Sequence, residues 1–142
     1  PYQQYSLEYL WKSWTFQAEY YTYSTFNRTY AGSTLLSRSH GHPDSWYVSA
    51  AYRFNKWFEA GAYYTEYYGN VDNRNGTGAA VSSDAYQKDV ALSFRFDPKD
   101  WWILKLELHR IQGTALLNNN SLNPVRDERA WYMLAAKTTF SF

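Results

Sequence analysis

Cysteine is absent from the 142 residues, which fits an exported chain but excludes little, because many cytosolic domains also lack it. Long apolar runs are missing as well. No stretch approaches the roughly 18 to 20 apolar residues that a transmembrane helix requires, which excludes a helical membrane protein. The segment after Pro1 is not a basic stretch followed by an apolar one, so we expect a mature form or a fragment rather than a precursor.

A strong charge of either sign is also missing. The chain has 14 Lys and Arg against 13 Asp and Glu, which gives a formal net charge of +1. Nucleic acid is attracted by a basic field, and the stacking of bases on aromatic side chains needs such a field beside it. We therefore expect no nucleic-acid partner.

Motifs that carry catalytic chemistry are scarce, and neither GxSxG nor HExxH occurs. One polar segment contains four residues that could be drawn as a hydrolase or metal site, namely Ser37, His40, His42 and Asp44. The two histidines have no clearly placed third ligand. Residues 72–76 faintly resemble a calcium loop, but Arg74 stands where a ligand is expected. The sequence therefore predicts no enzyme, no metal and no cofactor.

Aromatic residues are abundant. They make up 21% of the chain, with 15 Tyr, 7 Trp and 8 Phe. A soluble core of this size would use more Leu, Ile and Val, whereas Tyr and Trp suit surfaces that are apolar at one end and hydrated at the other. This excess points to an interface.

The hydrophobic pattern has a period of two along most of the chain, which is typical of β-strands. The last segment shows it best, with one side formed by Ala130, Tyr132, Leu134, Ala136, Thr138, Phe140 and Phe142. About seven such segments occur, at residues 5–12, 14–21, 46–54, 58–65, 89–96, 102–109 and 130–142. The sequence predicts an all-β fold in a single domain, residues 1–142.

The connections between these segments alternate in length. Tight turns are expected near residues 12–13, 55–56 and 97–100, and long polar loops near 27–44, 69–83 and 113–127. Aromatic side chains gather at both ends of the strands. Uneven connections and aromatic girdles are typical of a transmembrane antiparallel up-and-down β-barrel. The alternative is a soluble sandwich or ligand-binding barrel, which leaves the girdles unexplained.

The final segment, with Phe142 last and apolar residues at alternate positions before it, resembles the C-terminal signature strand of bacterial outer-membrane proteins. Residues 97–117 look like the region before the last strand in porin-like proteins of proteobacteria. The resemblance implies that the assembly machinery recognises Tyr132, Phe140 and Phe142. It also implies an integral protein of the Gram-negative outer membrane, in contact with the lipid bilayer and lipopolysaccharide, with a homotrimer as one arrangement.

The resemblance further implies a passive diffusion channel for small hydrophilic solutes or ions. An odd number of strands puts Phe142 on the periplasmic side and Pro1 on the extracellular side, whereas single-chain bacterial barrels have even counts. We therefore expect the chain to be the C-terminal portion of a larger barrel, with N-terminal strands missing, unless one strand has been overlooked and the count is eight.

If the apolar face meets lipid, the other face lines the lumen. The expected pore-lining residues are Glu19, Arg53, Glu59, Asp89, Arg95, Lys105, Glu107 and Lys137. Inward-facing tyrosines, Tyr21, Tyr23, Tyr47, Tyr63 and Tyr67, form either a stacking track for sugars or aromatic compounds or simple filler. Glu66, Lys88 and Arg110 fall on the lipid-facing register and are expected at the rim.

The alternative is a narrow barrel whose charges pair and fill the interior. The pairs to test are Arg53 with Glu59, and Lys105 with Glu107 or with residues of the neighbouring strand. Such a barrel would be a membrane anchor, a sheath or an adhesin scaffold.

Overall fold

The computed structural model describes residues 2–78, 82–117 and 129–141. Its strands are β1 (Tyr2–Trp11), β2 (Trp14–Tyr23), β3 (Thr25–Ala31), β4 (Thr34–Gly41), β5 (Asp44–Arg53), β6 (Phe58–Tyr68), β7 (Tyr86–Lys99), β8 (Trp102–Gly113) and β9 (Ala130–Phe140). Two short 3-10 turns, η1 (Val71–Asn73) and η2 (Ser82–Ala85), lie between β6 and β7. In the described residues no helix has the length and apolar character needed to cross a membrane. The predicted all-β class is confirmed.

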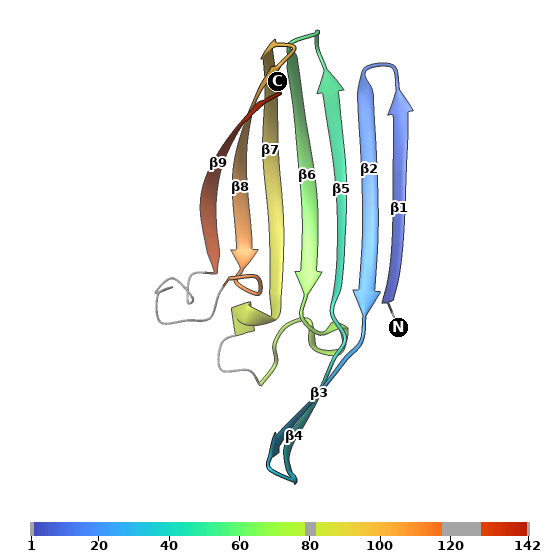
Figure 1. Cartoon of the computed structure of the whole chain (residues 1–142), viewed down its shortest axis with the longest axis vertical. Coiled ribbons are helices and arrows are strands. Elements are labelled where there is room, and N and C mark those ends of the chain that lie inside the picture. Colours follow the sequence, from blue (N-terminus) through green and yellow to red (C-terminus); the bar gives the residue numbers. More distant parts are fainter. Residues whose placement is uncertain (1, 79–81, 118–128, 142) are drawn as a thin grey trace.

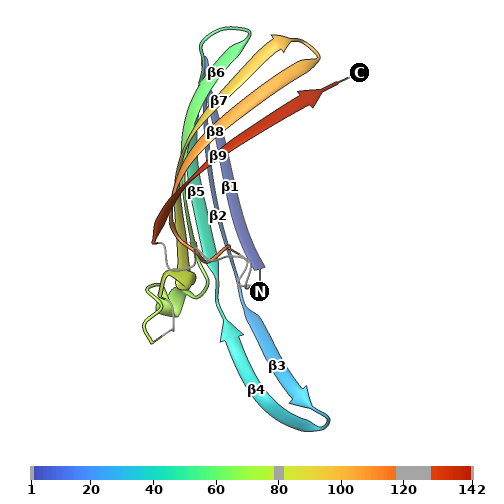
Figure 2. The same cartoon turned by 90° about the vertical axis from the view of Figure 1, so that its left-hand side faces the viewer.

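Seven strands form one antiparallel sheet in the order β1-β2-β5-β6-β7-β8-β9 (Figure 1). Apart from the insertion of β3 and β4, each strand pairs with the next one along the chain, which is an up-and-down arrangement. The sheet is curved and twisted, and β1 and β9 form its two edges (Figure 2). These edges do not pair with each other, so the sheet of the described residues is open.

The connections of the sheet differ at its two ends, as the sequence predicts. The short ones, at residues 12–13, 54–57 and 100–101, lie at one end, which we call the turn end. The longer ones lie at the other, the loop end, where β1 also begins (Figure 1). One boundary differs from the prediction: β7 continues to Lys99, past an irregular register between Phe96 and Lys99, so most of the expected turn at 97–100 belongs to the strand.

The prediction of a long loop at residues 27–44 is wrong. Instead, β3 and β4 form a second, two-stranded sheet that projects beyond the loop end (Figure 1). Gly32 makes the turn between them with a φ of 60°. Both faces of this hairpin are largely exposed, and they carry Phe26, Tyr30 and Leu36 as well as Ser, Thr, Asn and Arg. A hairpin that packs on nothing needs no alternation of apolar and polar residues, so the pattern that reveals the other strands is missing here.

The two faces of the main sheet have opposite chemistry. On β7, Asp89 and Ala91 point to one face and are 6% and 0% exposed. Val90 and Leu92, between and after them, point to the other face and are 47% and 46% exposed. β8 shows the same difference in exposure between its faces, because His109 and Ile111 are buried while Leu108 is exposed. We call the first the polar face and the second the apolar face. The polar face is thus the more buried of the two.

Aromatic rings follow the turn end of the apolar face. Trp14 packs on Tyr52 with ring centroids 4.9 Å apart, Tyr52 on Phe54 at 4.8 Å, and Phe54 on Phe58 at 5.3 Å. Phe58 continues the series to Phe96 at 5.1 Å. Beyond the next strand, Trp101 and Trp102 both stack on Phe140. The girdle expected at this end is therefore present as a nearly continuous band of rings.

Candidate functional site

All eight residues expected to line a lumen lie on the polar face. The registers place Arg53 opposite Glu59, Glu59 opposite Arg95, Arg95 opposite Lys105, and Lys105 opposite Lys137. These five residues form one row across β5 to β9 near the turn end, which we call the charged row. Glu107, Asp89 and Glu19 lie in rows closer to the loop end, on the same face. The side of the sheet to which each side chain points could therefore be deduced from the alternation alone.

Like charges stand side by side in the charged row. Arg95, Lys105 and Lys137 are direct neighbours on adjacent strands, an arrangement that destabilises a sheet unless counter-charges are near. In the part of the chain that the structure describes, neither lysine has an ion-pair partner within 4.0 Å. The expected Lys105–Glu107 pair is thus not formed, and both lysines are exposed on the polar face.

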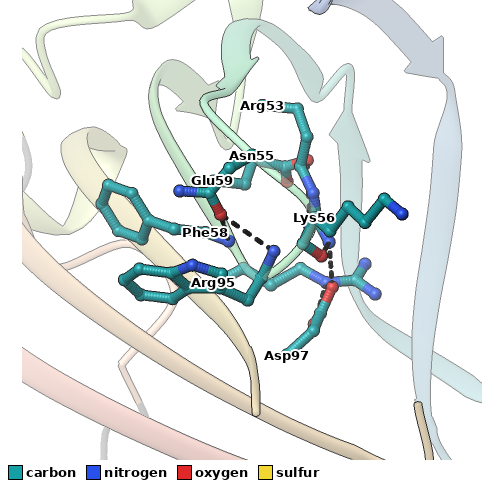
Figure 3. Close-up of polar contacts among 8 residues, drawn as sticks. Arg53, Asn55, Lys56, Phe58, Glu59, Arg95 and Asp97 are labelled. Carbon is teal, nitrogen blue, oxygen red and sulfur yellow. Dashed lines mark hydrogen bonds and ion pairs between the residues drawn. The ribbon is translucent and has the colours of Figure 1, made fainter. Parts of the chain in front are cut away.

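Arg53 and Arg95 converge on Asp97, which continues the same face one step beyond Arg95 (Figure 3). Arg95 Nε donates to Asp97 Oδ1 at 2.8 Å, and Arg53 donates to Asp97 Oδ2. Arg53 also pairs with Glu59 at 3.8 Å, as expected from the sequence. One carboxylate therefore holds two guanidinium groups from β5 and β7 at the turn end.

Asp97 was missed as a site residue because it was assigned to a turn. The signal was present, since residues 89, 91, 93, 95 and 97 keep the same parity along β7. Burial alone would raise the pKa of Asp97, but the hydrogen bonds and positive charges of Arg95 and Arg53 outweigh it and hold the pKa of this carboxyl below its ordinary value. Asp97 lies beyond Phe96, the last residue of β7 in regular register with β8.

A hollow of about 450 Å³ adjoins this ion-pair network. Its lining is strongly charged and includes Arg53, Arg95, Asp97, Lys99 and Asp100. The hairpin below it is held by Asn55, whose Oδ1 accepts hydrogen bonds from the backbone of Trp57 and Phe58 at 2.9 Å each. The turn end of the polar face therefore offers a hollow whose lining carries charges of both signs.

A second polar cluster lies toward the middle of the sheet. Tyr63 donates to Asp89 Oδ2 at 3.2 Å or contacts His109 Nδ1 at 3.0 Å, and His109 Nδ1 lies 2.8 Å from the same Asp89 oxygen. His109 Nε2 lies 3.5 Å from Glu107 but makes no hydrogen bond. Asp89 and His109 are almost fully buried among neighbouring side chains of the polar face. Asp89 is therefore covered, whereas Glu107 is half-exposed.

Charges also occur on the apolar face, at its loop end. Glu66 and Lys88 stand opposite each other on β6 and β7, with Lys88 Nζ 3.3 Å from Glu66 Oε1. Tyr64 and Tyr68 donate their hydroxyls to the same carboxylate. Arg110, on β8, is exposed. The rim position expected for these three charges matches their place near the ends of the strands, and two of them neutralise each other.

Two of the three residues expected to act as an assembly signal, Tyr132 and Phe140, lie on β9, the edge strand. Tyr132 and Phe140 both point to the apolar face and are exposed. Phe142 lies outside the described residues. An exposed apolar ladder on an unpaired edge is accessible to another protein, but its recognition stays a prediction.

Among residues 2–78, 82–117 and 129–141, no group of three His, Asp or Glu side chains is placed to hold a metal ion. His40 and His42 lie with ring centroids 6.4 Å apart, and His40 stacks on Phe26 at 4.5 Å. The ring contacts with Phe26 account for the position of His40 on the hairpin. Asp44 instead binds Arg74 at 2.7 Å, across to the η1 segment.

The comparisons with known proteins add no assignment. No protein-family model, no curated protein and no solved structure matches the chain at a significant level. The polar face, with its charged row and its buried His109 cluster, is therefore the candidate functional site.

Proposed function

We propose that the chain forms part of the wall of an outer-membrane β-barrel that lets small hydrophilic solutes or ions diffuse passively. The observation that carries the proposal is the inverted burial of the two faces. Alternating polar residues such as Asp89 and His109 are enclosed, while Val90, Leu92 and Leu108 are exposed. In water, a large exposed apolar face is unfavourable, whereas in lipid it is the expected outer surface of a barrel.

Strand length and the position of the aromatic band support this reading. The strands of the sheet have 10 to 14 residues, and about 9 to 11 residues in a tilted strand suffice to cross the hydrocarbon layer. The band of rings from Trp14 to Phe96 would lie at one membrane interface, where aromatic side chains are favoured. Lipopolysaccharide would then surround the loop end, and the assembly machinery would read Tyr132, Phe140 and Phe142.

The proposal requires the edges of the sheet to be paired. Exposed backbone N–H and C=O groups in hydrocarbon cost several kcal/mol each, roughly, so a membrane-spanning sheet has to close. β1 and β9 would each pair with a further strand, either from a longer chain or from another copy. More strands than eight would leave a water-filled lumen beside the charged row.

A second function, a non-transporting barrel that anchors or sheathes, is favoured by one feature. Arg53, Glu59, Arg95 and Asp97 pair with one another, and Asp89 pairs with His109, as in a filled interior. Against this stand Lys105 and Lys137, which have no counter-ion within 4.0 Å in the described part of the chain. Unpaired cations on an inner wall are expected where water and ions reach them.

Single-channel conductance separates these functions. The full-length protein would be inserted into a planar bilayer with salt on both sides, and discrete current steps are expected. Replacing Lys105 and Lys137 by Glu should shift the reversal potential in a salt gradient toward cation selectivity. The matched control is Lys12→Glu, in the β1–β2 turn, which should leave selectivity nearly unchanged. Fully inserted protein without current steps would contradict the channel and favour the anchor.

A further inference from the structure

The polar face contains a second hollow, and its chemistry differs from that of the charged one. It has a volume of about 330 Å³ and is lined by Gln17, Tyr47, Ser49, Tyr63 and Thr65. None of these side chains is charged. They come from three adjacent strands, β2, β5 and β6, in two neighbouring rows of the sheet. We call this the tyrosine hollow.

Some of its polar groups are already committed, which fixes the lining. Tyr63 is held by Asp89 and His109, as described above. Thr65 Oγ1 donates to the carbonyl of Trp46 at 2.9 Å. Gln17 Nε2 donates to Glu8 at 2.8 Å, which leaves its amide oxygen available as an acceptor. These bonds orient one ring and one amide oxygen in the hollow without the help of a ligand.

Other polar groups of the hollow have no partner within the described residues. The hydroxyls of Tyr47 and Ser49 make no hydrogen bond there, and both side chains are only partly exposed. Hydroxyls both donate and accept, so each suits a ligand hydroxyl equally well. The hollow thus combines two aromatic rings with unsatisfied, neutral hydrogen-bonding groups, the usual composition of a small-molecule site.

We propose that the tyrosine hollow binds one ring of a neutral sugar. The C–H groups on one face of a pyranose carry a small positive polarisation and lie well on the negative face of an aromatic ring. The hydroxyls around that sugar ring match Tyr47, Ser49 and the amide oxygen of Gln17. The lining itself carries no charge, although Glu19 and Glu8 border it, whereas an ionic solute would find charges of both signs in the charged row.

The inference rests on the proposed function, because the polar face must be hydrated and open for a sugar to reach it. It goes further in naming a solute class and its subsite. Two more tyrosines, Tyr21 and Tyr23, stack at 6.4 Å with an interplanar angle of 15° on the loop side of the hollow. A sugar entering from the loop end would therefore meet aromatic rings before it reaches Tyr47.

Equilibrium binding tests the inference independently of transport. Sucrose would be titrated onto the full-length protein in detergent micelles, and binding followed by saturation-transfer difference NMR. Saturable binding is expected. Tyr47→Ala should raise the dissociation constant by between about twofold and tenfold, the range expected for the loss of one aromatic contact. Tyr47→Phe keeps the ring and removes only the hydroxyl, so its dissociation constant should lie between those of the unmodified protein and Tyr47→Ala, and it guards against a folding defect.

The matched control is Tyr20→Ala, which removes a ring from the apolar face of the same region and should not change binding. Absence of sucrose binding, or equal losses in Tyr47→Ala and Tyr20→Ala, would overturn the inference. Conductance measured on the same preparation keeps the two proposals apart. Current steps without sucrose binding would leave a channel with no sugar site, and sucrose binding without current steps would remove the channel but keep the site.

Discussion

Neighbouring residues on the two faces of the sheet experience opposite environments. On the polar face, Asp89 and His109 are enclosed and bonded to each other, and charges at the turn end are gathered around Asp97. On the apolar face, Leu108 and Leu134 are exposed without any covering layer. Antiparallel sheets of soluble proteins show the reverse, with the apolar side packed on a core.

The sheet therefore has no core of its own on its apolar side. Its polar side chains form hydrogen bonds and ion pairs with one another, whereas its apolar side chains are not covered by any other part of the described chain. Glu66 and Lys88 are charged residues on the apolar face, but they lie at the loop end and pair with each other. These two charges of the apolar face therefore lie near the ends of their strands.

The largest expected effect comes from placing a charge in the middle of the apolar face. Leu134 and Met133 are consecutive on β9 and point to opposite faces, with exposures of 75% and 38%. In lipid vesicles, Leu134→Lys should lower the free energy of unfolding by about 2 to 4 kcal/mol, the cost of Lys at the bilayer midplane. Met133→Lys, the matched control, should cost much less. Urea titration followed by tryptophan fluorescence measures both.

The same pair of variants should behave differently if the apolar face met water. An exposed Leu replaced by Lys in a soluble protein changes stability by only about 0.5 kcal/mol in either direction. Equal effects of Leu134→Lys and Met133→Lys would therefore contradict a lipid-facing surface and return the chain to the soluble alternatives.

A smaller effect is expected from the buried cluster of the polar face. Asp89→Val removes the partner of His109 and of Tyr63 without opening a large cavity. A buried polar group that loses its hydrogen bond costs about 1 to 3 kcal/mol, and the Tyr63–His109 contact at 3.0 Å, which remains, places the expected cost toward the lower end. Glu107→Gln, at a half-exposed position beside the same histidine, should cost less. If both variants unfold at the same urea concentration as the unmodified protein, the cluster contributes nothing to stability.

The sequence predicted the strands of the main sheet and the face to which each candidate residue points. Both follow from a period of two, and the charges obey it because a wrong register would place every one of them on the apolar face. Glu19, Arg53 and Lys137 therefore lie on the same face of the sheet, as the alternation predicts. The turn-end aromatic band was predictable for the same reason, because Trp14, Phe54 and Phe96 stand beside short connections.

Other features could not be predicted, because they depend on distances between strands rather than on alternation. The β3–β4 hairpin packs on nothing, so no apolar period marks it. The sequence also does not show which charged residues pair. Asp97 rather than Glu59 binds Arg95 and lies closest to Arg53. Lys105 has no counter-ion among the described residues. The tyrosine hollow likewise requires side chains from β2, β5 and β6 in two adjacent rows, which only strand pairing reveals.

The smallest expected effect concerns the pH dependence of the turn end. Because the pKa of Asp97 is lowered by Arg95 and Arg53, its contribution to stability is fully present above the ordinary value of 3.8 and is lost as the pH falls through the folded-state value. The difference in unfolding free energy between the unmodified protein and Asp97→Asn should therefore be larger at pH 7 than at pH 3. Asp100→Asn, which removes a carboxylate of the next turn with no ion pair in the described residues, is the matched control for the loss of a negative charge at this end. A difference for Asp97→Asn that stays constant between these two pH values would mean that its carboxylate does not hold the arginines, and that the turn end of the polar face is stabilised by packing alone.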